Sequence, residues 1–148
     1  MTKQTPAHMA DDHAEKIKAS FQAQSMMDTL GACLMHVSRG FVEIQAPILP
    51  GSRQQHGFAH AGLTFAIGDS AAGYAALSVM PADHEVLTSE MKIHLLAPGQ
   101  GEVLIARGQV IKPGRRLVIV QADVYARSDA NEVHVAMLTG TMVPFAPK

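Results

Sequence analysis

Asp69 is the residue whose surroundings in this sequence point most strongly to chemistry. It lies within the run from Ala61 to Val79, which is rich in Ala and Leu and apolar on every helical face. A helix of that kind is expected to be buried. Burying a carboxylate without a partner costs several kcal/mol of folding free energy, or else burial raises the pKa of the group. Proteins tolerate such a group mainly at functional sites. Two interpretations stay open: Asp69 acts on a substrate, or it faces a solvent channel or a loop backbone.

The loop that enters this helix, Arg53 to Gly62, supplies a second feature. The first amides of a helix lack partners within the helix, and the helix dipole favours negative charge beside them. The amide of Ala61 can therefore hold the oxyanion that forms when a carbonyl is attacked, and losing one such donor typically costs about 3–4 kcal/mol. Gly57 and Gly62 would let the loop approach a substrate. An ordinary glycine-bearing loop explains the same residues.

Two glycines inside the predicted helix, Gly68 and Gly73, point to a close approach by another group. Each destabilises a helix by about 1 kcal/mol relative to Ala. Either a ligand or a neighbouring backbone would explain them.

The rest of the sequence predicts the elements that must position these residues. Asp11 or Asp12 is expected to cap a first helix, and a short helical turn follows at 25–30. An extended segment at 33–47 contains a turn at Arg39-Gly40 and is counted as one early strand. A loop at 47–57 then leads to the apolar helix. The hydrophobic period then changes from 3.6 to 2, which predicts strands at 85–96, 102–111, 117–126 and 133–143. The last three form an antiparallel meander.

This order predicts an α+β protein in which an antiparallel sheet wraps a long central helix, with a helical N-terminal segment. That arrangement is the hotdog fold. The 148 residues fit a flexible N-terminus at 1–10 and a single domain at 11–148.

Composition narrows the classes of function. The formal net charge of −1 argues against general nucleic-acid binding, and the single cysteine, Cys33, excludes an intrachain disulfide. Cys33 is expected to be a small buried hydrophobe. The polar N-terminus is unlike a signal peptide, and no apolar run approaches the roughly 20 residues that span a bilayer. We therefore expect a soluble cytoplasmic protein that binds no membrane.

The run H-G-F-A-H-A-G-L-T-F-A-I-G-D-S-A-A-G-Y-A resembles the PaaI-type acyl-CoA thioesterases of the hotdog superfamily. Their signature is His-Gly-Gly at the start of the central helix, with an acidic residue nine positions after the His. His60 and Asp69 have that spacing, and Gln54 and Gly57 match the family's residues six and three positions before the His. The resemblance runs from about residue 20 to 143. Ala61 departs from it, because it replaces the first glycine.

This resemblance implies hydrolysis of an acyl-CoA thioester without a cofactor. Asp69 would be the general base or nucleophile, and the Ala61 amide the oxyanion hole. His60 and Gln54 would lie near the thioester, and Thr88 would orient water. Family members place the site at a subunit interface and assemble as homodimers or homotetramers.

Substrate contacts are expected from Gly57 and Gly62 in the loop, and from Arg115 and Arg116, whose cationic side chains suit the phosphates of coenzyme A. A charged hairpin on the surface would explain the two arginines as well.

Three alternatives to the thioesterase hypothesis are considered: two other functions and a metal site. A non-catalytic acyl-CoA-binding protein would keep the pocket and lose the chemistry, and the Ala61 departure keeps that alternative open. A hotdog hydratase or dehydratase is disfavoured because the Asp-x-x-x-x-His pattern of those enzymes is missing. A metal site at His56, His60 and Asp69 is disfavoured by Gly57 and the loop context.

Overall fold

The computed structural model describes residues 9–148, and the predicted flexible segment 1–10 lies mostly outside the described residues. The helices are α1 (Asp11–Gln22), α2 (Ser25–Thr29) and α3 (Ala61–Leu77), with a single 3₁₀ turn at Pro50–Ser52. The strands are β1 (Cys33–Ser38), β2 (Phe41–Pro47), β3 (Glu85–Leu95), β4 (Val103–Pro113), β5 (Val118–Ser128) and β6 (Asn131–Phe145).

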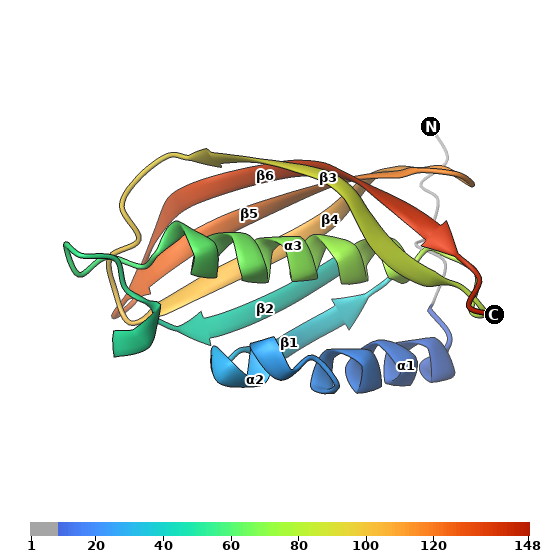
Figure 1. The fold of residues 1–148 in the computed structure, drawn as a ribbon, viewed down its shortest axis with the longest axis horizontal. Coiled ribbons are helices and arrows are strands. Elements are labelled where there is room, and N and C mark those ends of the chain that lie inside the picture. The colour runs from blue at the N-terminus through green and yellow to red at the C-terminus, as the bar shows by residue number, and fades with distance from the viewer. Residues whose placement is uncertain (1–8) are drawn as a thin grey trace.

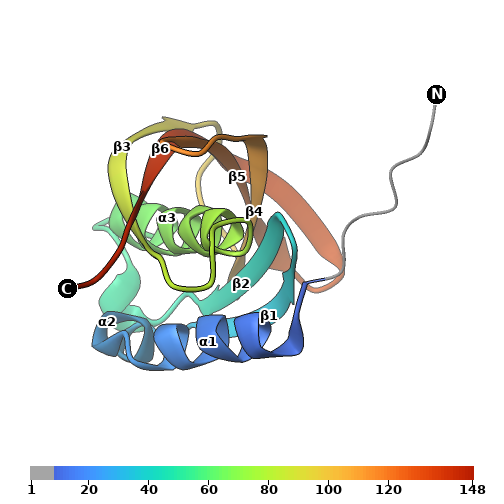
Figure 2. The same cartoon turned by 90° about the vertical axis from the view of Figure 1, so that its right-hand side faces the viewer.

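The six strands form one antiparallel sheet in the order β1-β2-β4-β5-β6-β3. The sheet curls around α3, while α1 and α2 lie below β1 (Figures 1 and 2). This is the predicted hotdog fold, and β4, β5 and β6 form the predicted meander. β3 follows α3 in the chain but pairs with β6, so β3 and β1 are the two edges of the sheet.

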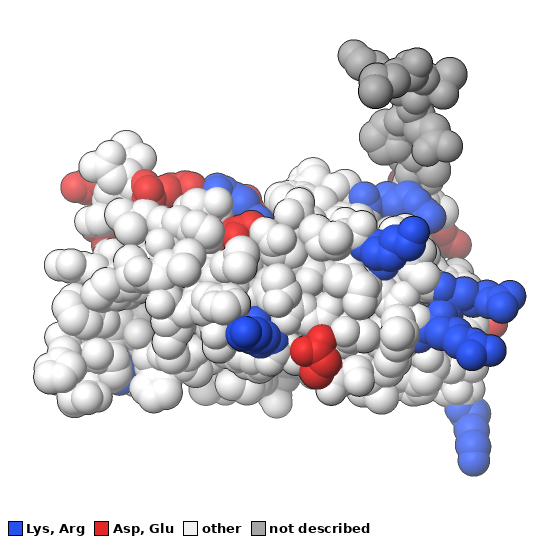
Figure 3. Space-filling model, turned by 90° about the horizontal axis from the view of Figure 1, so that it is seen from above, with Lys and Arg blue, Asp and Glu red and all other residues white. Residues whose placement is uncertain are grey.

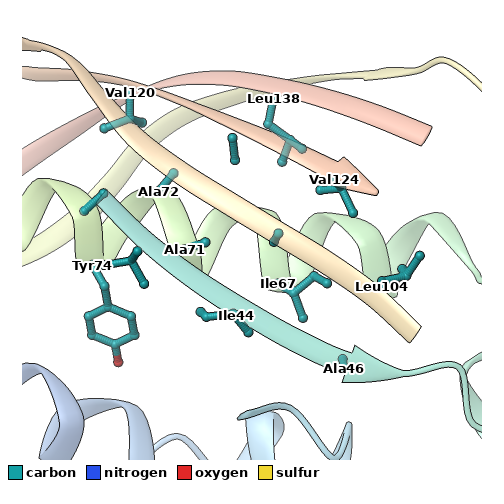
Figure 4. Close-up of a cluster of buried hydrophobic side chains, with 14 of the residues drawn as sticks. Ile44, Ala46, Ile67, Ala71, Ala72, Tyr74, Leu104, Val120, Val124 and Leu138 are labelled. Atoms are coloured by element: carbon teal, nitrogen blue, oxygen red, sulfur yellow. The ribbon is translucent and has the colours of Figure 1, made fainter. Parts of the chain in front are cut away.

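The core lies between the concave face of the sheet and α3, and most apolar residues of α3 are buried, as its sequence predicts. Figure 4 shows Ile67, Ala71 and Ala72 of the helix among side chains of the surrounding strands. The helix sits close to the sheet: a Cβ on Gly108 of β4 would lie 2.3 Å from the carbonyl carbon of Ala71. Small residues on both elements therefore set the helix height above the sheet, and that height fixes where Asp69 emerges.

Gly68 and Gly73 have different surroundings. A Cβ on Gly68 would lie 2.9 Å from the Leu138 side chain, so this glycine serves packing on the sheet. A Cβ on Gly73 would meet only the Met142 methyl at 3.8 Å. Gly73 lines a cavity described below.

Some local predictions were wrong. The extended segment 33–47, counted as one strand, is two strands. The predicted turn at Arg39-Gly40 joins them, and Gly40 has a φ of +81° there. Neither Asp11 nor Asp12 caps α1; both lie in its first turn, and Ala10 is the N-cap. Cys33 is exposed, because it begins the edge strand β1. Within residues 9–148, no helix is long and apolar enough to cross a membrane.

Candidate active site

The N-terminus of α3 presents one unpaired amide. His60 is the N-cap: its Nδ1 accepts a hydrogen bond of 2.8 Å from the Gly62 N–H, and its carbonyl accepts from the next two amides. For residues 9–148, no acceptor is found for the N–H of Ala61, which is exposed at the first helical position. The amide predicted to stabilise an oxyanion is therefore available.

The capping geometry explains two residues of the motif. Because Nδ1 accepts from Gly62, the proton of a neutral His60 lies on Nε2. A Cβ on Gly62 would lie 2.9 Å from that Nδ1, so a side chain there would displace the imidazole. The role of His60 that the structure makes visible is to cap the helix.

Gln54 is held by its own loop. Its Oε1 accepts hydrogen bonds from the backbone N–H groups of His56 and Phe58, at 2.5 and 3.3 Å. Gly57 makes the turn between them at φ +86°, a conformation that favours glycine. With Oε1 occupied, the Nε2 of Gln54 is left to donate to another group.

Gln54 and Ala61 line the same pocket, which we call the amide pocket. It has a volume of about 510 Å³ and its walls are mostly apolar. Phe58, Leu95, Leu96 and Val135 contribute to them. Two hydrogen-bond donors thus face an apolar space, which is typical of a ligand site.

Asp69 lies in a second cavity of about 260 Å³, which we call the acid pocket. The hydroxyl of Thr88, on β3, donates a hydrogen bond of 2.8 Å to Oδ1 of Asp69. Burial raises the pKa of the Asp69 carboxyl above its ordinary value, and the Thr88 hydrogen bond offsets part of that rise. The raised pKa suits a carboxylate that accepts a proton from water.

The two pockets lie at different heights along α3. Eight residues separate Ala61 from Asp69, which corresponds to about 12 Å along the helix axis. An attacked carbonyl must lie within about 3 Å of both its activating amide and the attacking group. In one chain these two groups are therefore too far apart to act on the same carbonyl.

The two arginines lie away from both pockets. Arg115 and Arg116 are exposed in the β4–β5 turn, and Arg115 lines a cavity of about 440 Å³ with Met80 and His84. Figure 3 shows basic side chains gathered at the end of the molecule where Figure 1 places this turn. Within the part of the chain that the structure describes, no cluster of three or more His, Cys, Asp or Glu side chains could hold a metal ion.

Among the residues that line the acid pocket, the polar side chains Ser20, Gln24 and Tyr74 were not predicted from the sequence to belong to a site. A buried tyrosine needs a partner for its hydroxyl. The position of Tyr74 on the apolar helix, five residues after Asp69, was the available signal. Its partners are Ser20, on α1, and Gln24, which lies between α1 and α2, and nothing in the local pattern indicates them.

Comparisons with known proteins agree with this architecture. The sequence pattern of the thioesterase superfamily matches residues 56–133. A thioesterase family protein from Silicibacter pomeroyi is 41% identical, with a TM-score of 0.89 over 91% of this chain and 99% of its own. No curated protein matches the chain.

Two more distant structures share the fold. The E. coli PaaI protein, from the phenylacetic acid degradation operon, is 19% identical with a TM-score of 0.82, over 95% of this chain and 98% of its own. A Bacillus halodurans protein solved with CoA is 24% identical with a TM-score of 0.71, over 90% of this chain and 84% of its own. The chain therefore belongs to the thioesterase superfamily and has the hotdog fold.

Proposed function

We propose that this thioesterase hydrolyses an acyl-CoA thioester to the free acid and coenzyme A. The observation that carries the proposal is Asp69, a half-buried carboxylate hydrogen-bonded to Thr88. Asp69 lies on a helix whose first amide has no acceptor among residues 9–148. The CoA in the Bacillus halodurans relative supports CoA esters as the substrate class.

The chemistry assigns a role to each group. The Ala61 N–H and the Gln54 Nε2 polarise the thioester carbonyl and stabilise the oxyanion of the tetrahedral intermediate. Asp69 either takes a proton from the attacking water or attacks the carbonyl carbon itself. Collapse of the intermediate breaks the C–S bond, and the thiolate of coenzyme A leaves and takes up a proton. Where Asp69 is the nucleophile, collapse leaves a mixed anhydride of Asp69 and the acyl group, and water then hydrolyses this anhydride to release the acid and restore the carboxylate. Water supplies the oxygen of the product acid in both routes.

We further propose that two chains build each site, with the Ala61 and Gln54 of one facing the Asp69 of the other. The separation of about 12 Å within one chain supports this. β3 is an unpaired sheet edge, and its exposed Leu87 and Leu95 are 57% and 58% accessible. Such an edge favours pairing with another strand. A homodimer or homotetramer would satisfy it.

Thr88→Val should move the acid limb of the pH dependence of kcat/KM to higher pH. The Thr88 hydroxyl lowers the pKa of Asp69, so its removal raises that pKa and keeps the carboxyl protonated, and inactive as a base, up to a higher pH. The measurement is the pH–rate profile from acid to neutral pH. Thr88→Ser keeps a hydroxyl and is the control. An unmoved acid limb in the valine variant would contradict the assignment of Thr88.

Replacing Arg115 and Arg116 together by Ala should weaken recognition of the nucleotide part of coenzyme A. We expect the ratio of kcat/KM for an acyl-CoA to that for the matching N-acetylcysteamine thioester, which lacks the phosphates, to fall about threefold to tenfold, the scale of exposed ion pairs. Added salt should reduce the difference. Lys18→Ala, on α1, controls for loss of positive charge. An unchanged ratio of the two kcat/KM values would show that neither arginine binds coenzyme A.

A non-catalytic acyl-CoA-binding protein is the alternative, supported by the methyl group of Ala61 where the family has glycine. Thiol release from a panel of short, long and aromatic acyl-CoA esters separates the two. Hydrolysis supports the thioesterase, whereas tight binding of the same esters without thiol release supports the alternative.

A further inference from the structure

Arg53 ties the loop that carries Gln54 to the end of β2, and the proposed hydrolysis gives it no role. Its guanidinium donates from Nη1 to the Gly57 carbonyl at 2.7 Å and from Nη2 to the Ile48 carbonyl at 2.8 Å. Ile48 is only 4% exposed, and its N–H donates to the Glu102 carbonyl at 2.9 Å, so it is a fixed point. Gly57 is exposed, in a loop that projects from the body of the molecule (Figure 1). Arg53 therefore anchors an exposed turn to a buried residue.

The carbonyl that Arg53 holds belongs to the same peptide unit as an amide that orients Gln54. The N–H of Phe58 lies in one plane with the Gly57 carbonyl and points the opposite way. That N–H donates to Oε1 of Gln54 at 3.3 Å. Holding the carbonyl therefore holds the N–H, and the N–H keeps Oε1 of Gln54 turned to the backbone. The Nε2 of Gln54 is then the group left for the thioester oxygen.

This one peptide unit can turn over while the backbone hydrogen bonds on both sides of it stay in place. The Gly57 N–H donates to the Gln54 carbonyl at 3.0 Å, and the Gln54 N–H donates to the Phe58 carbonyl at 2.9 Å. Neither bond uses an atom of the unit between Gly57 and Phe58. A Cβ on Gly57 would meet nothing within 4 Å, and glycine rotates freely, so packing does not hold this unit. Its orientation depends on the bonds to Arg53 and Gln54.

Turning the unit over would reverse the Gln54 side chain. The Gly57 carbonyl would then point at Gln54, whose amide would turn its NH2 group toward that carbonyl. Oε1 would face the thioester in its place, and an acceptor there repels an oxyanion instead of stabilising it.

We propose that Arg53 is a positioning residue for hydrolysis: its hydrogen bond to the Gly57 carbonyl keeps the Nε2 of Gln54 available to the oxyanion. The inference rests on the proposed function, which places Gln54 at the thioester. Arg53 acts through the loop and not by contact with the reacting atoms.

Arg53→Met should lower kcat for acyl-CoA esters by about tenfold to 100-fold and leave KM within about twofold, because an oxyanion donor acts in the transition state and not in substrate binding. Arg39→Met is the matched control, since Arg39 is also exposed and donates to a backbone carbonyl, that of Ser78, at 3.4 Å. Its kcat should equal that of the wild type. If Arg53→Met does not fold, Arg53→Gln, whose side chain is too short to reach both carbonyls, replaces it.

A double-mutant cycle with Gln54→Leu decides whether Arg53 acts through Gln54. Once Nε2 is absent, its position no longer matters, so Arg53→Met should lower kcat by less than about twofold in the Gln54→Leu background. A direct effect of the Arg53 charge on the oxyanion would persist in that background. A persistent loss would therefore overturn the inference, as would an Arg53→Met variant with the kcat of the wild type, and both results would leave hydrolysis intact.

Amide hydrogen exchange tests the same link without a substrate. Arg53→Met should speed the exchange of the Phe58 N–H and leave unchanged that of the Ala59 N–H, which donates to the Gly99 carbonyl at 2.8 Å. Faster exchange at both amides would mean that the whole loop opens, and unchanged exchange at Phe58 would mean that Arg53 does not hold the peptide unit. Either result would overturn the inference. A wild type that releases no thiol from any acyl-CoA ester would refute the proposed function and this inference with it.

Discussion

Asp69→Asn is expected to lower turnover of acyl-CoA esters by at least about 100-fold, the scale on which a general base contributes. The asparagine side chain has nearly the same shape and can still accept the Thr88 hydrogen bond. It cannot accept the proton of water or form an acyl-enzyme. Release of free thiol from the acyl-CoA panel, with wild type and variant side by side, measures the loss.

The same variant should keep its stability at neutral pH, or gain some. Burial raises the pKa of Asp69, so the folded state favours the protonated carboxyl. The stability that Asp69 contributes is then fully present below its ordinary pKa of 3.8 and is lost as pH rises through the raised value. Asparagine, uncharged throughout, carries no such penalty. Melting temperatures of the wild type and of Asp69→Asn, measured across this pH range, check the sign of the stability difference. An inactive variant that is also unfolded would leave the catalytic role unsupported, as would one with wild-type turnover.

Ala61→Pro is expected to lower kcat by about 100-fold to 1000-fold, because it removes the N–H assigned to the oxyanion. The fold should tolerate it. Ala61 is the first residue of α3, where the amide has no helical partner and proline is well accepted. His60, at φ −63° and ψ 140°, already has the extended conformation that precedes proline. The proline variant should therefore keep the melting temperature of the wild type while its kcat falls.

Ala61→Gly is the matched variant, since it keeps the amide and restores the glycine that the family carries. If the kcat of the glycine variant falls as far as that of the proline variant, the loss comes from the Ala61 side chain, and the assignment of the amide is wrong. A proline variant with wild-type kcat would have the same consequence.

Mixing the two inactive variants tests the two-chain site. Each mixed dimer of Asp69→Asn and Ala61→Pro chains holds one site with both changes and one with neither. Half of the dimers are mixed at random assembly, so about a quarter of wild-type activity should return. If each chain instead held a complete site, mixing would restore nothing.

Local patterns of hydrophobic residues were enough to predict the central helix and most of the strands. The apolar run around Asp69 predicted a buried helix, and alternation after residue 85 predicted the later strands, because periods of 3.6 and 2 report which side chains face a core. The motif spacing singled out Gln54, His60 and Asp69. The turn at Arg39-Gly40 was predicted, but the extended segment 33–47 around it was counted as one strand rather than as a hairpin of two.

The tertiary structure decided which distant residues meet. β3 follows α3 in the chain yet pairs with β6, and that pairing places Thr88 beside Asp69. Packing of the N-terminal helices α1 and α2 brings Ser20 of α1 and Gln24, the N-cap of α2, to the Tyr74 hydroxyl, across 54 and 50 residues of chain. Such contacts depend on strand order and on the rotation of one helix against another. Periodicity fixes the buried face of each element but not its neighbour. The sequence therefore singled out Asp69 and the Ala61 amide as candidates, and only the fold revealed the polar wall beside Asp69.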